Sequence, residues 1–408
     1  MLRRFTYCLV ILILLSICGC TTARAQYFRL ADNRKKVTTP FKMIRNMVII
    51  KLKINNKGPY NFILDTGVGV MIITDPTLID SLSIPHKKIT KISGLGGNEA
   101  YEAYATCPLN IEIPGMHSVD VGAYVFNTDH FGLSNYAGIP IHGLLGYDFF
   151  SKLVVKINFT DSSLTSYRPE VWKKPRGFES LPMSIEDRKP YITTPVSFCD
   201  ESVRQCKLVV DLGAGHPLSL ENSHTNQWPT RQAITANLGM GLTGPVKGKI
   251  SRVTRLSLGK YTLNNVLSSF PDNRVDNSLT QSRDGNLGVD ILKRFTVIFD
   301  YNNGKLYLKP RTSLHEPFEH DMSGMEYYAG GDDYDHIVVG RVEPGSASDE
   351  IGLEKDDEIV SVNLKPVLYM GLEELDRLFR SGNGRGLLLT VYHEKRYTHI
   401  ILTLKRRI

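Results

Sequence analysis

The sequence predicts a mainly β protein with two similar lobes and a small α/β domain at its C-terminal end. Three observations support this expectation. First, the pattern apolar, apolar, Asp, any residue, Gly, any residue, Gly occurs twice, as ILDTGVG at 63–69 and VVDLGAG at 209–215. Second, glycine-rich segments follow the two aspartates at similar distances. Third, beyond residue 312 short strand-like runs surround one helical run, which indicates a separate α/β unit.

The composition indicates a globular chain of two or three domains. Of its 408 residues, 42% are hydrophobic and 22% are charged, which provides enough apolar mass for packed cores. The formal net charge is +7, and Arg3, Arg4 and Arg24 near the N-terminus contribute three of these charges. A charge this modest gives no reason to expect a nucleic-acid partner.

Residues 1–25 are predicted to be an export signal. Arg3 and Arg4 precede an apolar run from Phe5 to Ile17 that is too short to span a bilayer comfortably. Two processing routes fit the segment: acylation of Cys20 in a lipoprotein signal, or cleavage after Ala25 in an A-x-A pattern. We therefore expect an exported protein that is periplasmic, secreted or, if Cys20 is acylated, attached to the outer membrane through an N-terminal lipid.

Each repeated aspartate is expected at the end of a strand. Before Asp65, the strand-like runs 48–54 and 60–64 flank the turn-forming segment NNKG, as in a hairpin. Before Asp211, the runs 191–198 and 207–210 flank a polar loop in the same way. Both aspartates should therefore lie in loops that leave a strand.

Later features repeat in the same order. The segments GLGG and GMGLTG begin 29 and 28 residues after their aspartates, and the last glycines of GLLG and GNLG lie 81 and 77 residues after them. A pair of strand-like runs follows each of the latter motifs. We therefore predict lobe 1 over residues 37–170, lobe 2 over residues 178–312 and a C-terminal domain over residues 320–408.

Three cysteines lie beyond the export signal. Cys199 and Cys206 flank the polar loop of lobe 2, so an exported protein could hold them either as a hairpin disulfide or as free thiols. Cys107 is expected to be a small buried hydrophobic residue.

Two aspartate loops that meet in one cleft would form a carboxylate pair. Carboxylates about 3 Å apart cannot both ionise, so they share one proton. The charged group can take a proton from water while the protonated group supports the carbonyl under attack. This chemistry hydrolyses an amide bond without a cofactor or a metal ion, so we expect neither. The glycines let backbone approach the carboxylates, and Thr66 offers a hydroxyl that can brace the loops.

These motifs resemble those of the two-lobed pepsin-like and retropepsin-like aspartic proteases. FILDTGVG with GLLGYDFF, and LVVDLGAG with NLGVDIL, carry the resemblance over residues 40–310. The whole chain is similar to exported bacterial aspartyl-protease-like proteins with a C-terminal PDZ domain, since the tail contains VEPGSAS, IGLEKDDEIVSVN and a late helical run. The resemblance implies a mainly β, pepsin/retropepsin-like fold of two lobes followed by a small α/β PDZ-like domain.

The resemblance also assigns roles to individual residues. Asp65 and Asp211 would be the catalytic pair. The two catalytic loops would be supported by Thr66, Gly67, Gly213, Gly146 and Gly288. Flap-like hairpins over the substrate would contain Gly94, Gly96, Gly97, Gly239 and Gly241. A peptide carboxylate, from a partner or a substrate, would bind the PDZ-like domain at Gly324, Met325, Glu326 and Tyr327.

Leu212 departs from the family pattern, which has a hydroxyl residue after the aspartate in both lobes. One bracing hydrogen bond, worth about 0.5–1.5 kcal/mol, would be missing. The sequence therefore leaves two functions open: an aspartic endopeptidase that acts on peptides or proteins, or a catalytically impaired peptide-binding protein of the same fold.

Two other site types are not expected. Residues 239–244 spell G-x-G-x-x-G, but Pro245 and a strand-like run follow where a dinucleotide site needs a helix. His315 and His320 are five residues apart with a proline between them, which does not fit a zinc site on a helix.

Overall fold

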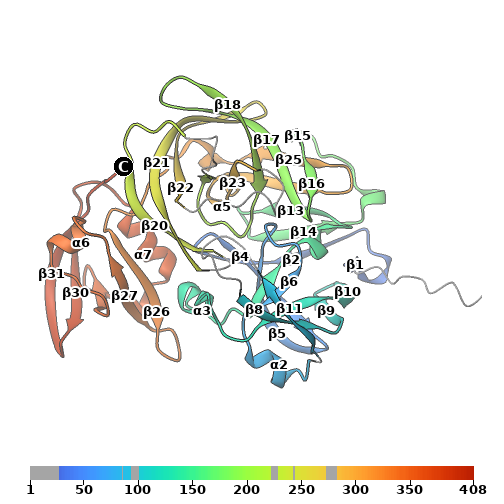
Figure 1. Ribbon diagram of the computed structural model, residues 1–408, viewed down its shortest axis with the longest axis horizontal. Coiled ribbons are helices and arrows are strands. Elements are labelled where there is room, and N and C mark those ends of the chain that lie inside the picture. Colours follow the sequence, from blue (N-terminus) through green and yellow to red (C-terminus); the bar gives the residue numbers. More distant parts are fainter. Residues whose placement is uncertain (1–26, 85, 93–100, 222–227, 242–243, 273–282) are drawn as a thin grey trace, which may run out of the picture.

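The structure is a computed structural model that describes residues 27–84, 86–92, 101–221, 228–241, 244–272 and 283–408. Four sheets build a mainly β fold, which confirms the predicted fold class. Figure 1 shows the C-terminal domain, in orange and red, packed beside the two lobes. No helix within the described ranges combines the length and the hydrophobicity needed to cross a bilayer.

Lobe 1 contains an 11-stranded sheet in which strands that are distant in the sequence are neighbours beside the first aspartate loop. Strand β12 lies between β5 and β6, parallel to β5 and antiparallel to β6. The order along the sheet is β1 (Arg29–Leu30), β10 (Met116–Val121), β9 (Leu109–Ile113), β4 (Met47–Ile54), β5 (Lys57–Leu64), β12 (Gly143–Leu145), β6 (Met71–Ile73), β11 (Ala123–Phe126), β8 (Tyr101–Thr106) and β7 (His86–Ile92), with β3 (Lys42–Ile44) paired to β4.

Lobe 2 repeats this arrangement in an eight-stranded sheet. The order along it is β16 (Ser184–Glu186), β17 (Lys189–Ser197), β18 (Val203–Val210), β23 (Gly285–Leu287), β19 (Leu218–Leu220), β22 (Tyr261–Pro271), β21 (Gly244–Leu258) and β20 (Ile234–Gly241). The strand order from β18 to β20 matches the order from β5 to β7 in lobe 1. In both lobes the central strand, β23 or β12, is parallel to the strand that precedes the aspartate. The two lobes therefore present their aspartate loops in equivalent positions.

A third sheet, which the sequence did not predict as a unit, joins the two lobes. Its order is β15 (Glu179–Pro182), β25 (Lys305–Pro310), β24 (Phe295–Asp300), β13 (Val154–Asn158), β14 (Ser163–Tyr167) and β2 (Lys36–Pro40). The strand pairs expected after GLLG and GNLG meet here, because β13 of lobe 1 is antiparallel to β24 of lobe 2. Phe150 and Phe299 pack across this junction with ring centroids 5.3 Å apart. The lobes thus share one continuous apolar core.

The C-terminal domain has its own sheet and its own apolar core. The sheet order is β26 (Met325–Gly330), β27 (His336–Val342), β28 (Glu358–Val362), β30 (Gly386–His393) and β31 (Arg396–Thr403), with β29 (Lys365–Pro366) paired to β28. Helix α7 (Leu372–Phe379) buries Leu375 and Phe379 in that core. The domain thus contains short strands around the helix α7, as predicted for the chain beyond residue 312.

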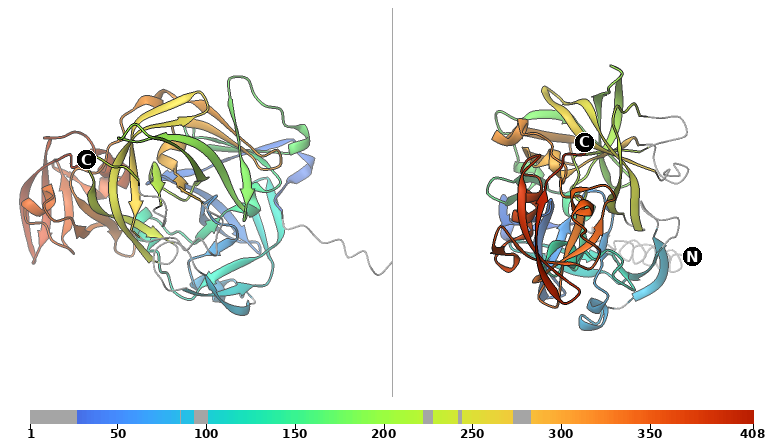
Figure 2. Two further views of the ribbon diagram at one scale, coloured as in Figure 1. Left: turned by 45° about the horizontal axis from the view of Figure 1, so that its top comes forward. Right: turned by 90° about the vertical axis from the view of Figure 1, so that its left-hand side faces the viewer.

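Short helices connect the strands. They are η1 (Ala31–Asn33), α2 (Thr77–Ser81), α3 (Leu133–Ala137), α4 (Tyr147–Phe150), η2 (Pro169–Val171), α5 (Val289–Leu292), η3 (Thr312–His315), α6 (Ala347–Glu350) and η4 (Val367–Tyr369). In Figure 1, α5 lies within the body of the molecule and α3 lies on the side that faces the C-terminal domain. The left view of Figure 2 also shows the C-terminal domain, in orange and red, at one end of the molecule.

The structure distinguishes between a disulfide and free thiols at Cys199 and Cys206. Cys199 and Cys206 are free thiols, and Cys107 is a half-buried free thiol. The ladder of β17 and β18 ends at the pair Ser197 and Val203, so Cys199 lies in the loop and Cys206 is three residues down the strand. Three strand residues span about 10 Å, which is more than the Cα separation of a disulfide. The register of the hairpin therefore keeps these two thiols apart.

Candidate active site

In each lobe, a backbone hydrogen bond joins the central strand of the sheet to the aspartate that follows the neighbouring strand. The amide of Asp65 donates to the carbonyl oxygen of Leu145 in β12 at 3.0 Å. The amide of Asp211 donates to that of Leu287 in β23 at 2.9 Å. Each aspartate thus comes directly after the buried end of a strand, at the strand end that the sequence predicted, and both loops are fixed by the same contact.

The two loops meet so closely that the predicted glycines contact the opposite carboxylates. A Cβ atom on Gly213 would lie 2.2 Å from Cγ of Asp65, and one on Gly67 would lie 2.9 Å from both carboxylate oxygens of Asp211. The amide of Gly67 donates to Oδ1 of Asp65 at 2.7 Å, and that of Gly213 to Oδ1 of Asp211 at 2.9 Å. The amide of each glycine therefore binds the aspartate of its own loop, and its missing side chain leaves space for the aspartate of the opposite loop.

Gly146 and Gly288 lie behind the aspartate loops, where backbone approaches backbone. A Cβ on Gly146 would lie 2.1 Å from the carbonyl oxygen of Val68, and one on Gly288 would lie 1.9 Å from that of His216. Burial lowers the pKa of the His216 imidazole, against the opposing charges of Asp211 and Asp290, and so favours its neutral form.

Thr66 joins the two loops across the lobe interface. Its hydroxyl donates to the carbonyl oxygen of Val210 at 2.6 Å and accepts from the amide of Leu212 at 2.9 Å. Leu212 has no hydroxyl to make the reciprocal bonds, and its fully buried side chain packs into the shared core instead. The hydrogen bonds between the two aspartate loops therefore come from the hydroxyl of Thr66, and lobe 2 has no matching hydroxyl at position 212.

We expect Thr66→Val to destabilise the protein by about 1–3 kcal/mol, because a buried amide and a buried carbonyl lose their partner. Urea unfolding monitored by tryptophan fluorescence measures this loss. Thr77→Val, which removes a hydroxyl from an exposed turn in α2, is the control and should change the free energy of unfolding far less. Equal effects of the two changes would contradict the bracing role of Thr66.

The two carboxylates lie in different surroundings. Burial, together with the charge of Asp211 and a hydrogen bond to it, raises the pKa of Asp65 well above its usual value. Asp211 accepts from a second donor, because Nδ2 of Asn286 lies 2.6 Å from its Oδ2. Donors to a carboxylate favour its charged form. The raised pKa favours the protonated form of Asp65, and the contact with Asn286 makes the surroundings of the two carboxylates unequal.

Sequence reasoning missed Asn286. The signal was present in the repeat: GNLG in lobe 2 has asparagine where GLLG in lobe 1 has Leu144. The side chain of Leu144 packs into an apolar cluster, whereas that of Asn286 is buried against Asp211. A single polar residue at a core position of a repeat is the feature that would have identified it.

We expect Asn286→Leu to move the acidic limb of the pH profile of peptide cleavage upward by about one unit, because a hydrogen bond to a charged group is worth about 1.5–3 kcal/mol. The sign follows from the loss of a donor that favours the charged carboxylate. Asn286→Ser, which keeps a donor, should shift the profile less. An unchanged acidic limb in Asn286→Leu would show that the amide does not act on the pair.

The flap-like hairpins are only partly described. Strands β7 and β8 form the stem of one hairpin, and Gly94, Gly96 and Gly97 lie outside the described residues. Strands β20 and β21, yellow in Figure 1, form the other, with Gly239 exposed at a φ of 108° and Gly241 paired with Gly244. The assignment of these glycines to substrate-covering flaps stays a prediction.

The residues expected to hold a peptide carboxylate occupy a tightly bonded loop. Oδ1 of Asp321 accepts from the amides of Ser323 and Gly324, both at 2.9 Å. Met325 is buried in the core of the C-terminal domain, and Glu326 pairs with Arg341 at 2.7 Å. The hydroxyl of Tyr327 donates to Asp376 of α7. Peptide binding by these residues stays a prediction.

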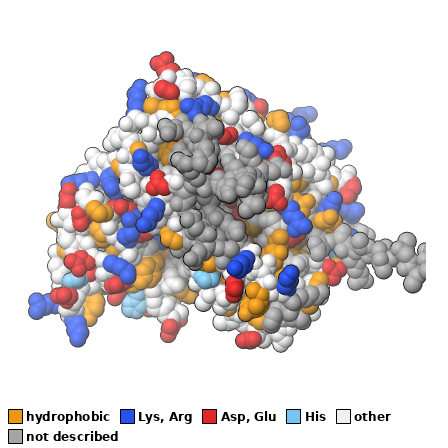
Figure 3. Space-filling view, in the orientation of Figure 1, with side chains coloured by type: hydrophobic (Ala, Val, Ile, Leu, Met, Phe, Trp, Pro, Cys, Tyr) orange, Lys and Arg blue, Asp and Glu red, His pale blue; other side chains and the backbone are white. Residues whose placement is uncertain are grey.

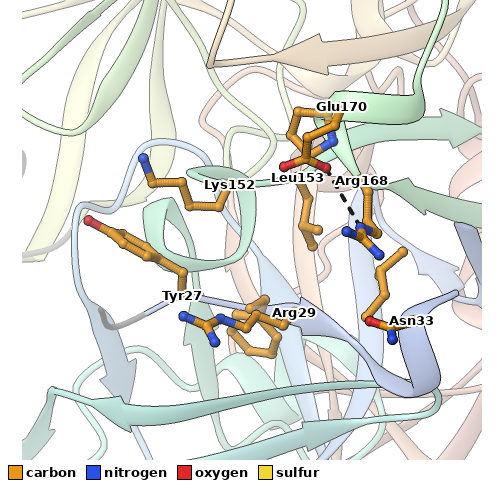
Figure 4. Close-up of a pocket in the computed structure, with 10 residues that line it drawn as sticks. Tyr27, Arg29, Asn33, Lys152, Leu153, Arg168 and Glu170 are labelled. Carbon is orange, nitrogen blue, oxygen red and sulfur yellow. Dashed lines mark ion pairs between the residues drawn. The ribbon is translucent and has the colours of Figure 1, made fainter. Parts of the chain in front are cut away.

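Other surface features lie apart from the carboxylate pair. Figure 4 shows a cavity of about 440 Å³ whose lining includes Tyr27, Arg29, Lys152, Arg168 and Glu170 and no residue of the aspartate loops. In Figure 3, basic and acidic side chains are interspersed over the visible face outside the grey residues. Within the described ranges, no group of three or more His, Cys, Asp or Glu side chains is placed to hold a metal ion.

Comparison with known proteins agrees with these assignments at the level of domains. Residues 50–149, which include Asp65 and Gly146, match the family model for aspartyl proteases. Residues 338–392 match the model for PDZ domains, which bind peptides or proteins. A search of curated proteins finds no match. The chain therefore contains an aspartyl protease domain and a C-terminal PDZ domain.

Proposed function

We propose that the protein is an aspartic endopeptidase that cleaves peptide bonds with Asp65 and Asp211. The observation that carries the proposal is the mutual packing of the two loops, in which Gly67 and Gly213 each lie against the carboxylate of the opposite lobe. This arrangement brings together two carboxylates that are 146 residues apart in the sequence. A shared proton is what such proximity requires.

The asymmetry of the pair suggests how the work is divided. Asp211, which accepts a hydrogen bond from Asn286, would take a proton from the attacking water. Asp65, whose raised pKa favours the protonated form, would donate a hydrogen bond to the substrate carbonyl oxygen. The proton taken by Asp211 would then pass to the leaving amine. No covalent bond between protein and substrate forms in this sequence.

A second function, peptide binding without efficient turnover, is favoured by Leu212. Its missing hydroxyl leaves the brace between the loops to Thr66 alone. A looser pair would lose rate, because small misplacements of catalytic groups are costly. The cleft would still bind an extended peptide.

The test is incubation of the purified protein with a mixed peptide library between about pH 3 and pH 8, the range over which a carboxylate pair titrates. Mass spectrometry then identifies the products. Cleavage that is abolished in Asp65→Asn and in Asp211→Asn would support the endopeptidase. Retention of intact peptides without cleavage at any pH would instead support the binding protein.

We also propose that the protein is exported, on the basis of the charged and apolar N-terminal segment. Acylation of Cys20 would attach it to a membrane, and cleavage after Ala25 would release it. Metabolic labelling with palmitate distinguishes the two routes when the native chain is compared with Cys20→Ala. Label that depends on Cys20 indicates the anchor, and equal labelling of both chains excludes it.

A further inference from the structure

We propose that the groove between β26 and α7 of the PDZ domain is a docking site for the chain's own β3–β4 turn, and that this turn positions the second catalytic loop. The turn consists of Arg45 and Asn46, which have φ angles of 47° and 64°. The part of the inference that concerns catalysis rests on the proposed peptidase function, whereas the docking itself does not.

The guanidinium of Arg45 is bound on several sides inside the groove. Nη1 donates to the carbonyl oxygen of Tyr327 in β26 at 3.0 Å, and Nη2 lies 3.2 Å from Oδ1 of Asp376 in α7. The backbone amide of Arg45 donates to Glu373 at the start of the same helix. Both walls of the groove therefore contact one residue of lobe 1.

Two aromatic rings complete this site. The guanidinium carbon lies 4.4 Å from the ring centroid of Tyr327 and 4.7 Å from that of Tyr136, which belongs to α3 of lobe 1. Only 5% of the Arg45 side chain is exposed. A charge this deeply buried must be paired and hydrogen-bonded, and cation–π contacts add to its stabilisation. The groove thus has the chemistry of a guanidinium-binding site.

Lobe 1 also covers the edge where a peptide strand would be added. PDZ domains bind peptides by pairing them with an edge strand, and β26 is an edge strand of its sheet. The carbonyl oxygens of Tyr327 and Ala329, two residues apart on β26, accept from Arg45 and from Nδ2 of Asn135 at 2.9 Å. Figure 1 shows α3, which contains Asn135, between lobe 1 and β26.

The loop before β26 is occupied in a similar way. Amides that could bind a terminal carboxylate already donate to the half-buried carboxyl group of Asp321. The carboxylate position, the strand edge and the groove are therefore all filled by groups of this chain. The partner that the groove fits best is the Arg45–Asn46 turn.

The same turn reaches the active site. Nδ2 of Asn46 donates to the carbonyl oxygen of Gly215 at 2.7 Å, and Oδ1 of Asn46 accepts from Nζ of Lys293 at 3.0 Å. Gly215 is four residues after Asp211, in the second catalytic loop. One turn therefore connects the PDZ groove to the loop that holds Asp211.

The pseudo-symmetric turn in lobe 2 shows what the PDZ domain adds. Asp187 and Arg188, with φ angles of 46° and 61°, form the β16–β17 turn, and Nη1 of Arg188 lies 3.4 Å from the carbonyl oxygen of Gly69 in the first catalytic loop. Each lobe thus holds the catalytic loop of the other with a turn. Only the lobe 1 turn is also held by the PDZ groove, among the contacts of the described residues.

Hydrogen exchange of the full-length protein, followed by mass spectrometry, tests this docking. In Arg45→Met, peptides that cover 325–330 and 211–217 should exchange at least tenfold faster than in the native chain. In Asn46→Ala only the 211–217 peptide should lose protection, because the arginine stays in the groove. Lys365→Met removes an exposed pair with Glu374 on the same helix and should change neither peptide.

Native-like exchange of both peptides in Arg45→Met would overturn the proposal. If that variant does not fold, Asp376→Asn replaces it, with the same expectation for 325–330 and the same overturning result. The measurement requires no turnover, so it separates the two proposals. Faster exchange in a protein that cleaves no peptide would support the docking and contradict the peptidase, whereas cleavage with unaltered exchange would do the reverse.

Discussion

Replacing either aspartate by asparagine is expected to lower kcat/KM for peptide cleavage by about 10³-fold or more, since the pair supplies both the general base and the general acid. The neutral amide of Asp211→Asn cannot take a proton from water. That of Asp65→Asn cannot hold the shared proton. Asp80→Asn, on the exposed side of α2, is the control and should cleave at the native rate.

The two variants should nevertheless be folded, and the stability of Asp65→Asn provides a second measurement. The pKa of Asp65 is raised in the folded protein by burial and by Asp211, so the folded state keeps a proton that the unfolded chain loses. Stability of the native chain therefore decreases as the pH rises above the usual aspartate pKa toward the raised one. The substitution Asp65→Asn removes this pH-dependent loss of stability. The melting temperature of Asp65→Asn at pH 7 should equal or exceed that of the native chain, and a large decrease would assign Asp65 a structural role.

The second large effect is expected at Gly213. A Cβ atom there would lie 2.2–2.4 Å from the carboxyl group of Asp65, so Gly213→Ala must displace the catalytic pair. Overpacking of this kind costs about 1–3 kcal/mol, and we expect the upper end together with loss of turnover. Gly67→Ala, with contacts of 2.9–3.0 Å, should be the milder change.

Gly122→Ala is the matched control for these two substitutions. No atom lies within 4 Å of a Cβ at Gly122, so the free energy of unfolding should change by less than about 0.5 kcal/mol. Urea unfolding and peptide turnover measure all three variants. Similar values for Gly213→Ala and Gly122→Ala would contradict the close approach of the two loops.

The parts of the fold that were predictable from sequence are those with local signals. Strand ends before Asp65 and Asp211 followed from apolar runs, and the duplicated order of motifs indicated two similar lobes. The need for glycines beside the pair could be predicted from the close approach of backbone to the carboxylates, whereas the distances between the two loops follow only from the fold. Family matching covers Asp65 but stops before lobe 2, so the second aspartate depended on the repeat.

Other features depend on contacts between distant parts of the chain. Arg45 looks like an ordinary residue of a polar turn, and its role follows only from its proximity to Asp376, more than 300 residues away. Asn286 resembles a surface residue by type, and the sequence marks it as a core position only through comparison with Leu144 in the repeat, while its contact with Asp211 follows from the fold. The shared sheet could not be anticipated, since apolar strand pairs do not reveal which edge they will meet.

The inserted central strands have a consequence for how the chain reaches its native state. Strand β12 lies about 80 residues after β5, with which it pairs, and the sequence separation of the paired strands β2 and β14 is larger still. Pairings of this sequence separation close large loops before they yield stabilising contacts, so folding should be slow. During that interval the apolar edges of β5 and β6 remain open to other chains, which makes the incomplete chain prone to aggregation. Slow refolding after dilution from urea, with yields that fall as protein concentration rises, is the behaviour this topology imposes.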